Sequence, residues 1–138
     1  MNKFILDSYA LLCLFDRKRA KENNAVKKHI EDSERGKAVL YMSKMNEGEV
    51  FYKLYKYLGP EVAHGFRADM KKGLFPIQVV SVNDKRVEAA SEIKAGYNVS
   101  YADAFCIGLA KEMGLPVITG DPEFEVVKDI ISIQRLSD

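Results

Sequence analysis

The chain has 138 residues, of which 47% are apolar and 30% are charged, with a formal net charge of +1. This length predicts a single domain spanning residues 1–138, and this composition excludes a disordered tail. The near balance of charges excludes a uniformly basic nucleic-acid-binding protein, although basic side chains around an acidic cleft would not appear in the total.

Membrane and export signals are not expected. No apolar run approaches the roughly 18 residues of a membrane span, and the N-terminal run is interrupted at Asp7, too early for a signal peptide. Cys13 and Cys106 lie in apolar, helix-like stretches, which predicts buried thiols and a cytoplasmic protein. His29 and His64 lie in polar helices away from the strand ends. We expect both at the surface. Because the chain has only these two histidines and no close cluster of cysteine and histidine, a zinc site is not expected.

The first half of the chain predicts two strands, at 4–6 and 38–42, and helices at 9–15, 25–34, 43–58 and 61–72. Residues 17–21 form a basic, hydrophilic stretch before the second helix. Gly36 ends that helix, Ser43 can cap the next one, and the Gly59-Pro60 pair ends it.

The second half predicts a β-branched strand at 77–80, a helix at 84–95, an apolar helix at 101–113 capped by Ser100, and a strand at 116–119. A short helix follows Asp121-Pro122, and 130–133 is expected to form the last strand. The strands alternate with helices, and their residue patterns are mainly apolar rather than alternating between apolar and polar. This pattern predicts an α/β fold with a mostly parallel sheet covered on both faces.

Acidic residues occur near the ends of these strands, where ligands bind in such sheets. Asp7 directly follows the first strand, and Asp121 follows the fourth strand after Gly120. Asp103 lies in the first turn of the helix before the fourth strand. Glu49 lies about two turns into the helix after the second strand, with Asn46 three residues earlier on the same helical face.

Each acid also has a structural explanation. Asp7 and Asp121 could be N-caps, Ser100-x-x-Asp103 resembles a capping box, and Glu49 could pair with Lys53 on a helix surface. Taken together, the four acids would crowd at one edge of the sheet, where they repel unless a cation neutralises them. Oxygen ligands without histidine or cysteine favour Mg²⁺ or Mn²⁺, and such ions promote phosphodiester hydrolysis.

Four segments contain these acids: FILDSYAL (4–11), MSKMNEGEV (42–50), VSYADAF (99–105) and ITGDPEF (118–124). In order and spacing they resemble the PIN-domain family, and within it the toxins of VapBC-type toxin–antitoxin pairs. The resemblance covers almost the whole chain. It implies a three-layer α/β/α fold, here with four to five strands, and Mg²⁺- or Mn²⁺-dependent endoribonuclease activity. It also implies an antitoxin partner, and homodimerisation is frequent in the family.

The resemblance also assigns residues. The family's acidic positions correspond to Asp7, Glu49, Asp103 and Asp121, which we expect to bind metal and catalyse. Supporting polar positions correspond to Ser8, Thr119 and Asn46, beside the capping residue Ser100. Tyr9 departs from the family, where a smaller residue is usual, and it is expected to narrow the cleft.

Two surface features suggest partners. Basic residues near the acids could contact RNA phosphates, and the best candidates are Arg17, Lys18, Arg19, Lys21 and Lys44. The aromatic segment 51–58 cannot be buried on every side of its helix. Its remaining surface would suit an antitoxin helix or a dimer contact.

Three other functions compete with a nuclease toxin. They are a PIN nuclease that processes RNA without an antitoxin, an inactive PIN-fold binding module, and a phosphoacceptor signalling domain. The last requires an acidic pair after the first strand and an aspartate after the third. Asp7 stands alone, and residues 80–83 contain no aspartate, which disfavours it.

Overall fold

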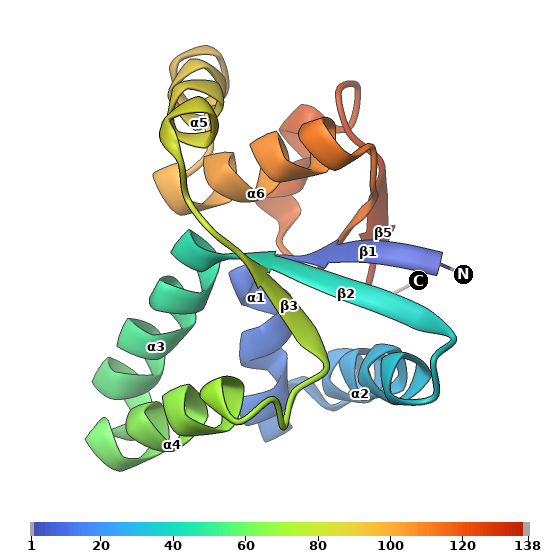
Figure 1. Ribbon diagram of the computed structural model, residues 1–138, viewed down its shortest axis with the longest axis vertical. Coiled ribbons are helices and arrows are strands. Elements are labelled where there is room, and N and C mark those ends of the chain that lie inside the picture. Colours follow the sequence, from blue (N-terminus) through green and yellow to red (C-terminus); the bar gives the residue numbers. More distant parts are fainter. Residues whose placement is uncertain (1, 137–138) are drawn as a thin grey trace.

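The protein forms one five-stranded parallel sheet between two layers of helices (Figure 1), as expected. The computed structural model describes residues 2–136. The strands follow the order β3-β2-β1-β4-β5 across the sheet. Their bounds are β1 (Asn2–Leu6), β2 (Ala38–Ser43), β3 (Ile77–Val80), β4 (Val117–Thr119) and β5 (Ile133–Arg135).

The helices divide between the two faces of the sheet. One face carries α1 (Ser8–Leu12), α2 (Ala20–Glu34), α3 (Lys44–Leu58) and α4 (Pro60–Lys71). The other carries α5 (Asp84–Gly96), α6 (Tyr101–Met113) and the 3-10 helix η3 (Pro122–Val127). Two further 3-10 helices, η1 (Cys13–Phe15) and η2 (Arg17–Arg19), lead into α2.

Neighbouring residues of the central strand β1 belong to different cores. Ile5 packs with α5 and α6, whereas Leu6 packs with α1, α3 and α4. Val117 and Ile118 divide in the same way in β4. Successive side chains of a strand point to opposite faces, so a sheet buried on both sides needs consecutive apolar residues. This explains the consecutive apolar residues in the central strands β1 and β4.

The topology creates a crevice beside β1. The chain runs from β1 outward to β2 and β3, and then returns to place β4 on the other side of β1. In open parallel sheets, ligands bind beyond the carboxyl ends of the strands at such a reversal of strand order. The segments that leave β1 and β4 begin with Asp7 and Gly120-Asp121, so both predicted acids lie at this point.

Two expected boundaries were wrong. α2 begins at Ala20 rather than near residue 25, and the amide of buried Asn23 donates to the Cys13 carbonyl at 2.8 Å, which anchors the early turn. The last strand lies at Ile133–Arg135, not at 130–133. The backbone N–H groups of Ile130 and Ile131 instead donate to the Val127 carbonyl, so the apolar pair forms a turn.

Smaller expectations had mixed outcomes. The first helix is α-helical only to Leu12 and continues as the 3-10 helix η1. Cys13 and Cys106 are buried free thiols, as expected. His64 is exposed, but His29 is half-buried and packs edge-to-face on Phe4 of β1, so its expected surface position was wrong.

Across residues 2–136, no helix combines the length and apolar character that a membrane span requires.

Candidate active site

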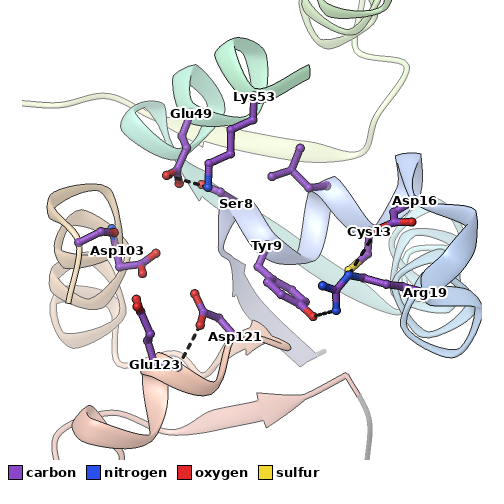
Figure 2. Close-up of a pocket in the computed structure, with 12 residues that line it drawn as sticks. Ser8, Tyr9, Cys13, Asp16, Arg19, Glu49, Lys53, Asp103, Asp121 and Glu123 are labelled. Carbon is purple, nitrogen blue, oxygen red and sulfur yellow. Dashed lines mark hydrogen bonds and ion pairs between the residues drawn. The ribbon is translucent and has the colours of Figure 1, made fainter. Parts of the chain in front are cut away.

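A cleft of about 410 Å³ opens at the carboxyl ends of β1 and β4 (Figure 2). Its walls come from the segment after β1, from α3, from the start of α6 and from the segment after β4. The lining residues are Ser8, Tyr9, Leu12, Cys13, Asp16, Arg19, Glu49, Lys53, Ser100, Asp103, Asp121 and Glu123. Three of the four predicted acids therefore face one cavity.

The tightest acidic group in the cleft consists of Asp103, Asp121 and Glu123. One carboxylate oxygen of each lies within 4.8 Å of the other two, and Figure 2 shows the three side chains pointing toward one another. Glu123 was not predicted from the sequence. The available signal was its position two residues after Asp121, which places a second acid in the first turn of η3.

Capping interactions hold these acids in place. Ser100 Oγ accepts the Asp103 backbone N–H at 3.1 Å, which starts α6. Asp121 caps η3, because its Oδ1 accepts the Glu123 N–H at 2.9 Å. For Asp103 and Asp121 the capping explanation and the clustering explanation are compatible, because the capping interactions place both carboxylates in the cleft.

Asp7 lies beneath the cleft rather than in the tight group. It is fully buried, its Oδ1 accepts the Ala10 N–H at 2.8 Å, and its Oδ2 accepts the Thr119 hydroxyl. Burial raises the pKa of Asp7 to about 8. The hydrogen bonds oppose this shift, and the charges of Asp103 and Asp121 add to it. Asp7 is thus electrostatically coupled to the cluster without lining the cleft.

Glu49 reaches the cleft from α3 and also remains outside the group of three. Its carboxylate is almost buried, and its Oε2 accepts from the Tyr52 hydroxyl at 3.4 Å. Burial raises the pKa of Asp103 to about 6. The charge of Asp121 adds to this, Ser100 opposes it, and Glu49 contributes further.

The predicted supporting residues link the elements that carry the acids. Thr119 Oγ1 donates to Asp7 and accepts the Asp121 N–H at 2.9 Å, so one hydroxyl connects the ends of β1 and β4. The Asn46 amide donates to Ser8 Oγ and to the Ala102 carbonyl, both at 3.1 Å, joining α3 to α1 and α6.

The donor set fits a hard divalent cation. All of the acids offer oxygen, and three carboxylates converge closely enough to share one ion. Burial is the main cause of the raised pKa values of Asp7 and Asp103, and the neighbouring acids add to it, so both carboxyls would be easier to ionise beside a positive charge. Asn46 Oδ1 is buried without a hydrogen-bond partner among the described residues, but Asn46 does not line the cleft. Asp103, Asp121 and Glu123 could hold the ion, with Glu49 opposite.

The basic residues expected around the site are only partly there. Arg19 lines the cleft, and Lys18 lines an apolar groove beside it. Lys44 lies outside the cleft, and Arg17 and Lys21 are exposed and do not line it. Arg19 is thus the single residue of the five that the fold brings to the acids. Whether any of them binds RNA stays a prediction.

Comparison with known proteins agrees with this geometry. A family model described as PIN domain matches residues 4–130. No curated protein matches the sequence.

Solved structures with the same fold include several toxin–antitoxin proteins. A chain of DNA-bound VapBC from Salmonella typhimurium superposes with a TM-score of 0.70 at 24% identity, covering 99% of each chain. VapC20 from Mycobacterium tuberculosis, described as a sarcin-ricin loop cleaving toxin, gives a TM-score of 0.72 at 18% identity. That match covers 88% of this chain and 92% of VapC20. At these identities the likeness establishes the fold.

Proposed function

The chain belongs to the PIN-domain family, and from this premise we propose that it is a metal-dependent endoribonuclease acting as the toxin of a toxin–antitoxin pair. The observation that carries the proposal is the convergence of Asp103, Asp121 and Glu123 in an open cleft at the crevice beside β1. A cluster of this kind gains most from a hard cation, and an open cleft admits a polymer.

The chain's own residues have distinct tasks in this proposal. Asp103, Asp121, Glu123 and Glu49 hold Mg²⁺ or Mn²⁺, which would polarise a phosphate oxygen and lower the pKa of an attacking water. Asp7 supports them from below, and its raised pKa makes it the acid that most needs a neighbouring positive charge to ionise. The Thr119 hydroxyl bridges Asp7 and the Asp121 backbone and so fixes their relative positions.

Surface features support the proposed partners. Tyr52, Tyr55, Tyr57 and Leu58 are exposed on α3. An apolar groove formed by residues including Leu12, Phe15, Leu54, Tyr57 and Leu58 adjoins the cleft. We infer that this surface receives the antitoxin or a second copy of the chain, as expected from the aromatic segment. The VapBC structures of the same fold support an antitoxin, and RNA as substrate implies action in the cytoplasm.

Cleavage of RNA by the purified protein tests the enzymatic part. Activity is expected with Mg²⁺ or Mn²⁺ and is expected to stop in EDTA. Asp121→Asn and Glu123→Gln should each lower the rate by roughly a hundredfold, since charge positioned around the reacting phosphate is lost. Glu88→Gln changes an exposed acid of α5 outside the cleft and serves as the matched control. Undiminished cleavage in EDTA would exclude the mechanism.

Growth after expression tests the toxin role. The wild type should slow growth, Asp7→Asn should not, and the product of a small adjacent gene should relieve the effect. Harmless expression of an active nuclease would favour RNA processing without an antitoxin. A folded protein that binds RNA but never cleaves it would favour the inactive binding module.

A further inference from the structure

Lys53 brings a positive charge into the acidic cleft. It lies one turn after Glu49 on α3, and its Nζ is 3.4 Å from Glu49 Oε2. Figure 2 shows the two side chains side by side, across the cleft from Asp121 and Glu123. The pairing was anticipated as an ordinary surface contact of a helix, but Lys53 lines the same cavity as the acids.

The surroundings of Lys53 differ from those of a surface lysine. Burial alone would lower its pKa, yet Glu49 and the more distant Asp103 raise it overall. Glu49 is the main cause of the rise in the pKa of Lys53, and Asp103 is the smallest of the causes. Its side chain remains 39% exposed, against 11% for Glu49, so the ammonium is accessible from the cleft.

Glu49 is already occupied by the chain's own groups. The same oxygen, Oε2, contacts both Lys53 and the Tyr52 hydroxyl. Glu49 lies outside the tight group formed by Asp103, Asp121 and Glu123. A divalent cation and an ammonium beside the same carboxylate repel each other in a partly desolvated site, so binding of the cation weakens the contact between Lys53 and Glu49.

We propose, resting on the function proposed above, that Lys53 occupies Glu49 in place of a metal ion and moves to an RNA phosphate when the ion binds. Its four-carbon stem can swing, and its three donors suit a phosphate oxygen without requiring a fixed geometry. The cleft would thereby exchange one ion pair for another. Binding of the metal ion would free the Lys53 ammonium from Glu49, and the ammonium would then contact the phosphate backbone of the substrate.

Calorimetric titration with Mn²⁺ at neutral pH tests the exchange without any reaction. Lys53→Met removes the charge and keeps the length, so its affinity for Mn²⁺ should rise by about three- to tenfold. Lys53→Arg keeps the charge and should stay near wild type. Lys56→Met is the matched control, because Lys56 is exposed on the same helix and makes no ion pair or hydrogen bond among the described residues.

Steady-state cleavage at saturating Mn²⁺ tests the phosphate contact. Lys53→Met should raise KM for single-stranded RNA by roughly tenfold, as expected for loss of a charged contact. The slope of log affinity against log salt should fall by about 0.7, because one fewer counterion is released. A purely structural lysine would leave that slope unchanged.

The outcomes separate the two proposals. An unchanged or weaker Mn²⁺ affinity in Lys53→Met overturns the exchange, as does an equal gain in Lys53→Arg. An unchanged KM and salt slope overturn the phosphate contact. If the wild type binds Mn²⁺ but cleaves no RNA, the proposed function is wrong, and so is the proposed phosphate contact. The titrations would still decide whether Lys53 competes with a cation for Glu49.

Discussion

Asp7 and Thr119 show how single residues set the properties of the site. Both are fully buried, and the Thr119 hydroxyl joins Asp7 to the backbone of Asp121. Without this link, the loop after β4 would depend on η3 and on Arg135, which donates to the Asp121 carbonyl at 2.7 Å. A buried hydroxyl with both its donor and its acceptor in use is costly to replace by an apolar group.

Gly120 is a second residue that affects the site, because the space around it admits no side chain without rearrangement. A Cβ at this position would meet the Glu22 carboxylate and lie 2.5 Å from a ring carbon of Tyr9. The Tyr9 ring cannot withdraw easily, because its hydroxyl donates to Glu22 at 2.9 Å and accepts from Arg19 at 2.5 Å. Any side chain here therefore pushes the loop that carries Asp121.

Gly120→Ala should accordingly destabilise the protein by about 1–3 kcal/mol through overpacking. It should also lower RNA cleavage by at least roughly tenfold, since small displacements of catalytic groups are costly. Thermal melting and cleavage assays measure both effects. Gly65→Ala is the control, because a Cβ there meets nothing within 4 Å and should slightly stabilise α4. Full activity in Gly120→Ala would contradict the packing argument.

At the scale of elements, helix starts place the acids. Ser100 begins α6 and fixes Asp103, just as Asn83 begins α5, where its Oδ1 accepts the Arg86 N–H at 2.9 Å. The two caps are chemically alike, but only the first adjoins the cleft. Comparing the two caps therefore separates the loss of folding stability that follows from removing a cap from any loss of metal binding at the site.

Ser100→Ala and Asn83→Ala should each destabilise the fold by about 1 kcal/mol. Only Ser100→Ala should weaken Mn²⁺ binding, because the first turn of α6 orients the Asp103 carboxylate. Melting curves in EDTA and calorimetric titration with Mn²⁺ give the two readouts. Equal Mn²⁺ affinity in the two variants would reduce Ser100 to a structural cap without influence on the site.

For the molecule as a whole, the raised pKa values make stability depend on pH. Asp7 and Asp103 have folded-state pKa values of about 8 and about 6, against an ordinary value of 3.8. The folded protein therefore binds protons more tightly than the unfolded chain over this range. The stability from protonated Asp7 and Asp103 is complete below about pH 4 and is lost as pH rises through 6 and 8.

The metal-free protein should thus melt at a lower temperature at pH 8 than at pH 5.5. Asp103→Asn removes one of the two groups, so in EDTA at pH 8 it should be more stable than wild type by about 1–2 kcal/mol. If Asp103 were only a favourable first-turn acid, the same change would cost up to about 1 kcal/mol. Melting scans in EDTA at both pH values distinguish these outcomes.

Mn²⁺ should reverse the trend, because an ion bound only to the folded state stabilises it by about 2.7 kcal/mol at a hundred times Kd. Wild type should gain melting temperature with millimolar Mn²⁺ at pH 8, and Asp103→Asn should gain much less. Equal gains would remove Asp103 from the metal site and weaken the assignment of the whole cluster.

Local sequence patterns predicted the order of the strands and helices and most of their boundaries. The alternation of apolar strands with helices predicted the parallel sheet. The positions of Asp7 and Asp121, just after two of these strands, predicted that both lie at the carboxyl ends of the sheet. Glycine, proline and capping residues determined most of the helix ends. These features depend on neighbours in the chain, so the sequence by itself contains them.

Other features depend on packing between distant elements, and only the tertiary structure decided them. The apolar pair at 130–131 forms a turn instead of a strand, and in this turn Ile131 is buried in the core while Ile130 packs against it. Glu123 lies beside Asp103 although the two are twenty residues apart in the chain, and Asp7 is buried beneath the cleft, where Thr119 of the neighbouring strand donates to it. The direction of a side chain at a site is set by such contacts, which the order of residues does not state.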